Sequence, residues 1–442
     1  MIYLGLLLFF VLEYVRPGNF IPGVNALRLN SLVPFAVVFG SFVKKSRVSN
    51  QALIREPNTK ILIFWLFLIF MSVVTADVQM RALECFETAF AYTLMYVAIV
   101  KLVTDVRRLT GVFLALLVVH LIVVGLSPDM LVDPSSRSHY LAAGSFLGDG
   151  NDFALSVNIA IPLCLFLLLE TKRVLFRLAY LAVLLFLVMC VIATQSRGGT
   201  IALACVGLYY WLKSDKKVLT GLVALAVVAL ILICAPPSYY ERMNTITHNA
   251  EDGSAQGRIM AWRAAVRMAA DHPLLGVGAA HFPVKFGLEY LPKGEIGEMT
   301  AHSIYFLVLG ELGFPGLGVL LFFFASNLIA NKRVAARSSA RDPVRRAMDK
   351  RLLNAMSAAL IAYVSGGLFL SALYYPHMYV LAGLLTASRL LVTERDLAAE
   401  VAVPVPSVDA VSTRGVQRPG RRPASALVWD RRQGRRVSGL QR

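Results

Sequence analysis

Two short segments carry side chains that could take part in a reaction. Arg197 lies in the sequence Ser-Arg-Gly-Gly between two apolar stretches, where glycines allow a ligand to approach closely. Its planar guanidinium group could bind a diphosphate through paired hydrogen bonds, or it could reach from the membrane edge to lipid headgroups. His302 precedes the apolar stretch 303–330 and can exchange a proton near neutral pH. It could equally be a solvent-facing histidine at a helix end.

The polar stretch at residues 236–300 contains a predicted amphipathic helix over residues 257–271. Apolar side chains form one stripe at helical spacing, and arginines flank it on both sides. The stripe consists of Ile259, Trp262, Val266 and Ala270, with Arg258 on one side and Arg263 and Arg267 on the other. Such a helix suits the membrane interface, with its guanidinium groups at the level of lipid phosphates. Arg263 and Arg267 could therefore serve only to place this helix.

Other titratable residues are weaker candidates. His272 belongs to a predicted turn, and His281 lies between two apolar stretches. Glu298 is close enough to His302 in sequence to act as a base in its place. The segment 148–153 contains two aspartates that could bind a divalent metal, but no other acidic cluster accompanies them. Helix capping in this segment is the stronger interpretation, and we expect no metal site.

These residues must be positioned by helices in a membrane. The chain is 57% hydrophobic and only 16% charged, far from the composition of soluble domains. A span needs about 20 mostly apolar residues, and about twelve such stretches are present. They lie near residues 2–15, 30–43, 61–75, 83–100, 109–126, 153–169, 174–194, 199–212, 218–235, 303–330, 352–371 and 376–392. The predicted fold is an all-α polytopic membrane bundle, residues 1–393, with one large loop at residues 236–300.

The distribution of positive charge predicts the orientation of the chain in the membrane. The net charge is +17, and the Lys and Arg residues gather in alternate loops, as the positive-inside rule requires. The basic loops are 44–60, 101–108, 170–177, 213–217 and 331–351. This distribution excludes nucleic acid as the partner and places both termini in the cytoplasm and the loop at 236–300 outside. Residues 394–442 are rich in Pro and Arg and are predicted to be a disordered basic cytoplasmic tail.

Several segments together resemble the O-antigen ligase and O-antigen polymerase superfamily of bacterial membrane glycosyltransferases. The matching segments are Gly144 to Ala154, Ser196 to Gly199, Gly257 to Trp262, Asp271 to Gly278 with Phe282, and His302-Ser303 followed by Glu311 to Gly316. Their order and spacing match over about residues 144–325, the predicted ligase-like core. No single motif is specific for this superfamily, whereas the ordered set of motifs is.

The resemblance implies a substrate class and roles for named residues. Family members take a glycan from undecaprenyl diphosphate at the periplasmic face of the inner membrane and transfer it to a hydroxyl group of lipid A–core, a glycan or a protein. Arg197 and Arg258 would bind the diphosphate and His302 would act as the general base, without a metal or other cofactor. A single displacement would invert the anomeric configuration.

Two kinds of alternative remain. Within the family, the chain could be an O-antigen or exopolysaccharide polymerase or a protein O-oligosaccharyl ligase, because no short motif marks the acceptor. Outside it, the chain could be a transporter or flippase. That class predicts internal repeats, broken helices and charges near the membrane midplane. The sequence contains no evident repeat, and its informative polar residues gather at one face.

Overall fold

The computed structural model describes residues 1–44, 46, 48–128, 146–234, 239–240, 253–291, 299–338 and 342–401. The predicted all-α class is confirmed, because these residues form helices and no strand. The chain divides into a large unit, Met1–Ala399, and a second unit, Glu400–Arg442. The predicted disordered tail lies almost wholly outside the described residues, and so do residues 236–238, 241–252 and 292–298 of the predicted loop at residues 236–300.

The long helices coincide with the stretches predicted to span the membrane. They are α1 (Ile2–Val15), α2 (Leu29–Val43), α4 (Pro57–Thr75), α5 (Gln79–Leu102), α6 (Val106–Leu126), α8 (Gly150–Glu170), α9 (Val174–Ala193), α10 (Arg197–Lys213), α11 (Lys217–Cys234), α15 (Ile304–Arg337), α16 (Pro343–Gly366) and α17 (Pro376–Val401). The shorter elements are α3 (Asn50–Arg55), α14 (Phe282–Lys285), the 3-10 helices η1 (Pro17–Asn19), η2 (Asn25–Leu27), η4 (Gly367–Phe369) and η5 (Ala372–Tyr374), and the π-turn η3 (Phe286–Tyr290). The amphipathic helix is α13 (Gly253–Asp271), somewhat longer than predicted.

Length and composition qualify eight helices of the described chain as membrane spans. They are Asn25–Val43, Pro57–Val74, Gln79–Leu102, Val106–Leu126, Gly150–Glu170, Val174–Ala193, Ile304–Arg337 and Pro343–Phe369. The apolar helices Ile2–Val15 and Lys217–Ala229 are shorter. A 14-residue helix such as α1 reaches about 21 Å, less than the ~30 Å of a bilayer core. The total of about twelve spans therefore stays a prediction.

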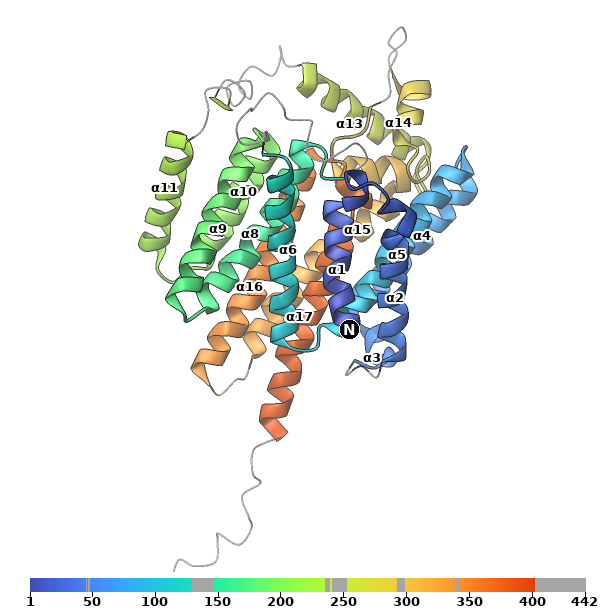
Figure 1. Cartoon of the computed structure of the whole chain (residues 1–442). Coiled ribbons are helices and arrows are strands. Elements are labelled where there is room, and N and C mark those ends of the chain that lie inside the picture. The colour runs from blue at the N-terminus through green and yellow to red at the C-terminus, as the bar shows by residue number, and fades with distance from the viewer. Residues whose placement is uncertain are drawn as a thin grey trace, which may run out of the picture. The chain divides into compact units, whose positions relative to one another are not determined.

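The long helices of the large unit run side by side, with α13 across one end of them (Figure 1). Helix α8 packs against α9, α10 and α16, while α15 packs against α4, α13 and α16. The N-terminus and the last turns of α17 lie at the end away from α13 (Figure 1). The charge pattern in the sequence predicts the cytoplasmic side for that same end.

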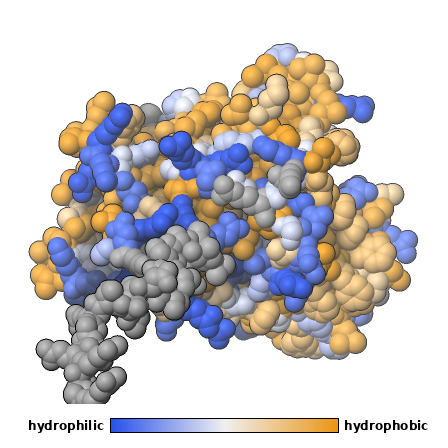
Figure 2. Space-filling view, turned by 90° about the horizontal axis from the view of Figure 1, so that it is seen from below, coloured by the Kyte–Doolittle hydropathy of each residue, from blue (hydrophilic) through white to orange (hydrophobic). Residues whose placement is uncertain are grey.

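The sides of the bundle expose apolar side chains. Phe35 on α2, Leu175 on α9 and Val218 on α11 are 70%, 76% and 79% exposed. On the face away from α13, hydrophobic residues lie around the edge and many hydrophilic residues lie within it (Figure 2). Side chains of this kind are stable against lipid and unfavourable against water, which agrees with a bundle that crosses a membrane.

A network of buried polar side chains joins α4, α15 and α17 at the end away from α13. Asn58 and Asn327 pair through their amide groups at 2.8 and 3.0 Å, and Asn58 also donates to Thr386 Oγ1 at 2.9 Å. Arg389 Nη1 donates to Asn327 Oδ1 at 2.8 Å and to Asn331 Oδ1 at 3.0 Å. Each side chain of this network therefore has a hydrogen-bond partner inside the protein, as a low-dielectric environment favours.

Helix α15 is interrupted at Gly313, which has φ 65° and ψ −164°. Phe314 N beyond the kink donates to the carbonyl oxygen of Pro273 at 3.0 Å. A Cβ atom at Gly313 would lie 2.5 Å from that oxygen, so the kink requires glycine. The sequence predicted one uninterrupted span at residues 303–330. The structure instead separates a first segment, which follows His302 and lies under α13, from the rest of the helix.

Candidate functional site

The start of α10 holds Arg197 against α8. Ser196 caps the helix, because its Oγ accepts a hydrogen bond from Gly199 N at 3.0 Å. A Cβ atom at Gly199 would lie 2.7 Å from Ala154 Cβ, so the two helices approach closely here. Asn158 of α8 also donates to the Gly199 carbonyl oxygen at 3.0 Å. These contacts fix the first turn of α10 and place Arg197, half-buried, within it.

The 3-10 helix η4 lies between the starts of α10 and α15. A Cβ atom at Gly198 would lie 2.9 Å from Phe369 Cβ, at one end of η4. A Cβ atom at Gly367, at its other end, would lie 2.4 Å from Ile304 Cδ1 in the first turn of α15. The two helix starts therefore contact the same short element. The arginine of α10 and the histidine before α15 consequently lie at the same end of the bundle.

His302 occupies a constrained position directly before α15. Its φ of 48° lies in the left-handed region, which non-glycine residues rarely adopt. Ala301 and Ser303 on either side are buried, whereas His302 itself is half-buried. Burial lowers the pKa of His302, the positive charge of Arg258 lowers it further, and the Asp149 carboxylate partly offsets both effects. The imidazole is therefore biased toward the neutral form, which can accept a proton.

Asp149 brings the start of α8 into this site. Its Oδ1 accepts a hydrogen bond from Asn151 N at 2.6 Å, which confirms the predicted capping role. Asp152, one turn further along, accepts a hydrogen bond from Tyr375 Oη at 3.3 Å. Among the described residues, no group of three or more His, Cys, Asp or Glu side chains could hold a metal ion. The acidic residues of this segment thus have structural and electrostatic roles in the present geometry.

Comparison with known families identifies the central part of the chain. Residues 181–321 match the O-antigen ligase family. The match runs from α9 to beyond the kink of α15 and includes Arg197, Arg258 and His302. No curated protein matches the chain. The resemblance to the O-antigen ligases is therefore confirmed over residues 181–321, and the predicted segment Gly144 to Ala154 lies outside this match.

Within the O-antigen ligase segment, α13 packs on α15 through small residues. Its buried face consists of Ala261, Ala264, Ala265, Met268 and Ala269. The predicted apolar stripe points elsewhere: Ile259 and Val266 are 45% and 51% exposed. The helix therefore has two apolar faces: the face of small side chains packs on α15, and the predicted stripe is partly exposed but contacts α15 through Trp262, which stacks on Phe306. The sequence did not distinguish them, because alanine contributes little to an apolar stripe.

The exposed stripe lines an open groove of about 490 Å³ beside α15. Its lining residues are Ile259, Trp262, Arg263, Val266, Arg267 and Phe306. Arg263 and Arg267 are exposed and border the apolar floor, in agreement with the predicted position at an interface. Arg258, by contrast, is half-buried, and its positive charge lowers the pKa of His302.

The structure gives His281 a structural role. Its Nδ1 lies 2.8 Å from the Ala279 carbonyl oxygen, and its Nε2 accepts a hydrogen bond from Val78 N at 3.1 Å. Both ring nitrogens are thus used, and the side chain is fully buried. His272 is exposed and lines a separate pocket of about 300 Å³. The possible alternative base Glu298 lies outside the described residues.

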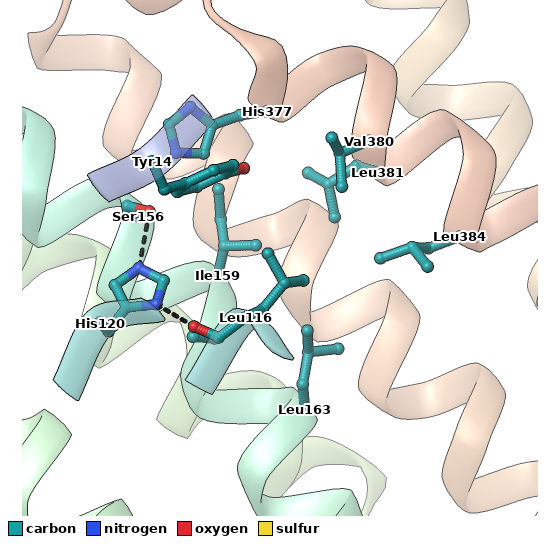
Figure 3. A pocket seen from close by; sticks show the side chains of 11 residues that line it. Tyr14, Leu116, His120, Ser156, Ile159, Leu163, His377, Val380, Leu381 and Leu384 are labelled. Carbon is teal, nitrogen blue, oxygen red and sulfur yellow. Dashed lines mark hydrogen bonds between the residues drawn. The ribbon is translucent and has the colours of Figure 1, made fainter. Parts of the chain in front are cut away.

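Two further histidines, which the sequence did not lead us to predict as site residues, lie inside the bundle. His120 Nε2 lies 2.7 Å from Ser156 Oγ, and His377 has no hydrogen-bond partner in the described structure for either ring nitrogen. They line a cavity of about 20 Å³ together with Tyr14 (Figure 3). This volume suits a single water molecule and excludes a sugar. A histidine within an apolar span is energetically unfavourable in lipid, so its position in the sequence could have marked it as a candidate functional residue.

Proposed function

We propose that this protein transfers a glycan from undecaprenyl diphosphate to an acceptor hydroxyl group at the outer face of the membrane. The match to the O-antigen ligase family indicates glycan transfer by a membrane protein. The observation that carries the more specific proposal is the position of His302. It lies within the electrostatic reach of Arg258, in a constrained loop, and at the same end of the bundle as Arg197.

The proposed reaction is a single displacement. The acceptor oxygen attacks the anomeric carbon as the bond from that carbon to the diphosphate oxygen breaks. His302 takes the hydroxyl proton, and the electron pair of the broken bond leaves with the diphosphate. Arg197 and Arg258 stabilise the negative charge of that leaving group. Attack from the side opposite the leaving group inverts the anomeric configuration, and no metal ion is needed for these steps.

The groove beside α13 supports a lipid-linked donor. Its floor of Trp262 and Phe306 is apolar, and it opens to the outside of the bundle. A polyprenyl chain could lie there with its diphosphate directed toward Arg258, one turn before Trp262 on the same helix face. Arg263 and Arg267 would then face lipid phosphates at the rim.

The orientation of the chain can be tested with reporter fusions. A periplasmic reporter fused after Tyr290, in the loop beyond α13, should be active. The same reporter fused after Asp342, between α15 and α16, should be inactive. The opposite result would place α13 and the proposed site in the cytoplasm, where no undecaprenyl-linked donor of this kind would be presented to it.

The decisive experiment uses purified protein in liposomes with an undecaprenyl-diphosphate glycan and candidate acceptors. We expect a covalent glycan product and free undecaprenyl diphosphate. Movement of the intact donor across the membrane without a product would instead support a flippase. The lipid that accumulates when the protein is removed from cells identifies the acceptor class. Undecaprenyl-linked polymer would indicate a ligase, and undecaprenyl-linked single repeat units would indicate a polymerase.

A further inference from the structure

The backbone around His302 is held by one residue of α13. Trp262 Nε1 donates a hydrogen bond to the Ala301 carbonyl oxygen at 2.9 Å. The indole ring also stacks on Phe306, with ring centroids 4.8 Å apart and an angle of 11° between the planes. Trp262 therefore contacts the residue immediately before His302 and a residue one turn after it.

These two contacts help to hold His302 in an unfavourable backbone conformation. A histidine with φ 48° persists only where its surroundings fix the chain on both sides. On the carboxyl side, Leu307 N donates to the Ser303 carbonyl oxygen at 2.9 Å and begins α15. On the amino side, Trp262 donates to Ala301, and Thr300 Oγ1 donates to Ser371 Oγ at 2.7 Å. Removing the indole N–H would therefore remove the hydrogen bond on this side that lies nearest to the constrained residue.

We propose that Trp262 is a positioning residue that fixes the orientation of the His302 imidazole relative to Arg258. The inference rests on the proposed function and adds a residue to its site. Arg258 and Trp262 are four residues apart on α13, so they project from neighbouring turns of one face. A single rigid helix thus carries the group assigned to the diphosphate and the group that orients the base. Small errors in such an alignment reduce the rate of reaction more than they reduce binding.

The test compares Trp262→Phe with the wild-type protein in the liposome assay. Phenylalanine retains an aromatic ring against Phe306 and lacks the N–H donor. We expect kcat to fall about tenfold, while the KM for the undecaprenyl-linked donor stays within about twofold. We also expect the acid limb of the kcat/KM profile to move to higher pH. A loosened His302 loses part of the burial and of the Arg258 proximity that lower its pKa.

Trp211→Phe is the matched control. Trp211 Nε1 also donates to a backbone carbonyl oxygen, that of Lys217, but at the opposite end of α10. This variant should keep the wild-type kcat, KM and pH profile. If Trp262→Phe fails to accumulate in the membrane, Phe306→Leu provides the second variant. It keeps the hydrogen bond to Ala301 and an apolar side chain in the groove floor but removes the stacked ring, so kcat should fall by a smaller factor while the KM changes by no more than about twofold.

The outcomes separate this inference from the proposed function. A wild-type kcat and acid limb in Trp262→Phe, beside an inactive His302→Asn, would overturn the positioning role alone. A change confined to the KM for the donor would also overturn it, because Trp262 would then act only through the groove floor that it shares with Phe306. Full activity of His302→Asn, or no covalent product from the wild-type protein, would overturn both. A lower kcat with a shifted acid limb supports the inference.

Discussion

His281 and His302, which both follow α13 in the chain, have opposite surroundings. His281 is fully buried, and both of its ring nitrogens interact with backbone groups, so its orientation is fixed and its lone pair is already used. His302 is half-buried, and its ring forms no hydrogen bond with another described residue. Its backbone is constrained instead, at φ 48°.

The difference distinguishes a histidine that stabilises the fold from a histidine that is available for a reaction. A histidine whose nitrogens both interact with the backbone stabilises the structure and cannot accept another proton without losing a bond. A histidine held through its backbone keeps its ring nitrogens for a substrate. The same residue type therefore provides either a structural contact or a chemical group, according to which of its atoms the protein uses.

The largest predicted effect is the loss of turnover when His302 is replaced. Replacing His302 with Ala should lower turnover by about 10²–10⁴-fold, the usual contribution of a general base, with donor binding retained. His302→Asn is the sharper variant, because asparagine tolerates the left-handed conformation while it lacks the base. Turnover with a purified donor and donor binding should be measured separately. Loss of donor binding in both variants would assign His302 to the diphosphate site.

The next largest effect is expected at Arg197. Lysine keeps the charge but loses the planar pair of donors, so Arg197→Lys should lower kcat/KM about 10–100-fold at unchanged protein levels. Arg263→Ala is the matched comparison on the exposed rim, and it should lower kcat/KM far less. Equal activity of Arg197→Lys and the wild type would show that a point charge suffices there.

At His281 the expected effect is on stability. His281→Ala leaves Val78 N and the Ala279 carbonyl oxygen unpaired, at a cost of about 1–3 kcal/mol for each buried group. The melting temperature in detergent should fall, and turnover per folded molecule should change little. His272→Ala, at an exposed position in the same loop, should leave both quantities unchanged. A stable but inactive His281→Ala would contradict the structural role.

The smallest effect concerns Asp149. Its carboxylate raises the pKa of His302 against the lowering effects of burial and Arg258. A base works when it is unprotonated, so activity is lost as pH falls through its pKa. Asp149→Asn removes the raising effect and keeps an equally good helix cap, so the acid limb of kcat/KM should move to lower pH. A shift to higher pH would exclude this electrostatic role.

Much of this arrangement could be predicted from the sequence. Apolar periodicity predicted the long helices and α13, and an ordered set of short motifs predicted the family. Local signals of this kind depend on residues close together in the chain. The capping role of Asp149 was predictable for the same reason, since its partner Asn151 is two residues away.

Other features depend on contacts between distant segments and could not be predicted. His281 accepts its hydrogen bond from Val78, about two hundred residues earlier in the chain. The contact of Trp262 with Ala301 crosses the loop in the same way. The kink at Gly313 exists because Pro273 approaches the helix there. The roles of these residues became evident only when the segments were placed together.

The buried network of Asn58, Asn327 and Arg389 has a mechanical consequence. Lipid offers no replacement partners, so separating α4, α15 and α17 at that end would leave several polar groups unpaired, each at a cost of several kcal/mol. Glu311 has the same effect beneath α13, where its buried carboxylate accepts hydrogen bonds from Phe282 N at 2.9 Å and from Tyr374 Oη at 2.6 Å. Buried polar contacts therefore hold the bundle together at both ends, and a lateral opening for a lipid would have to leave both sets of contacts intact.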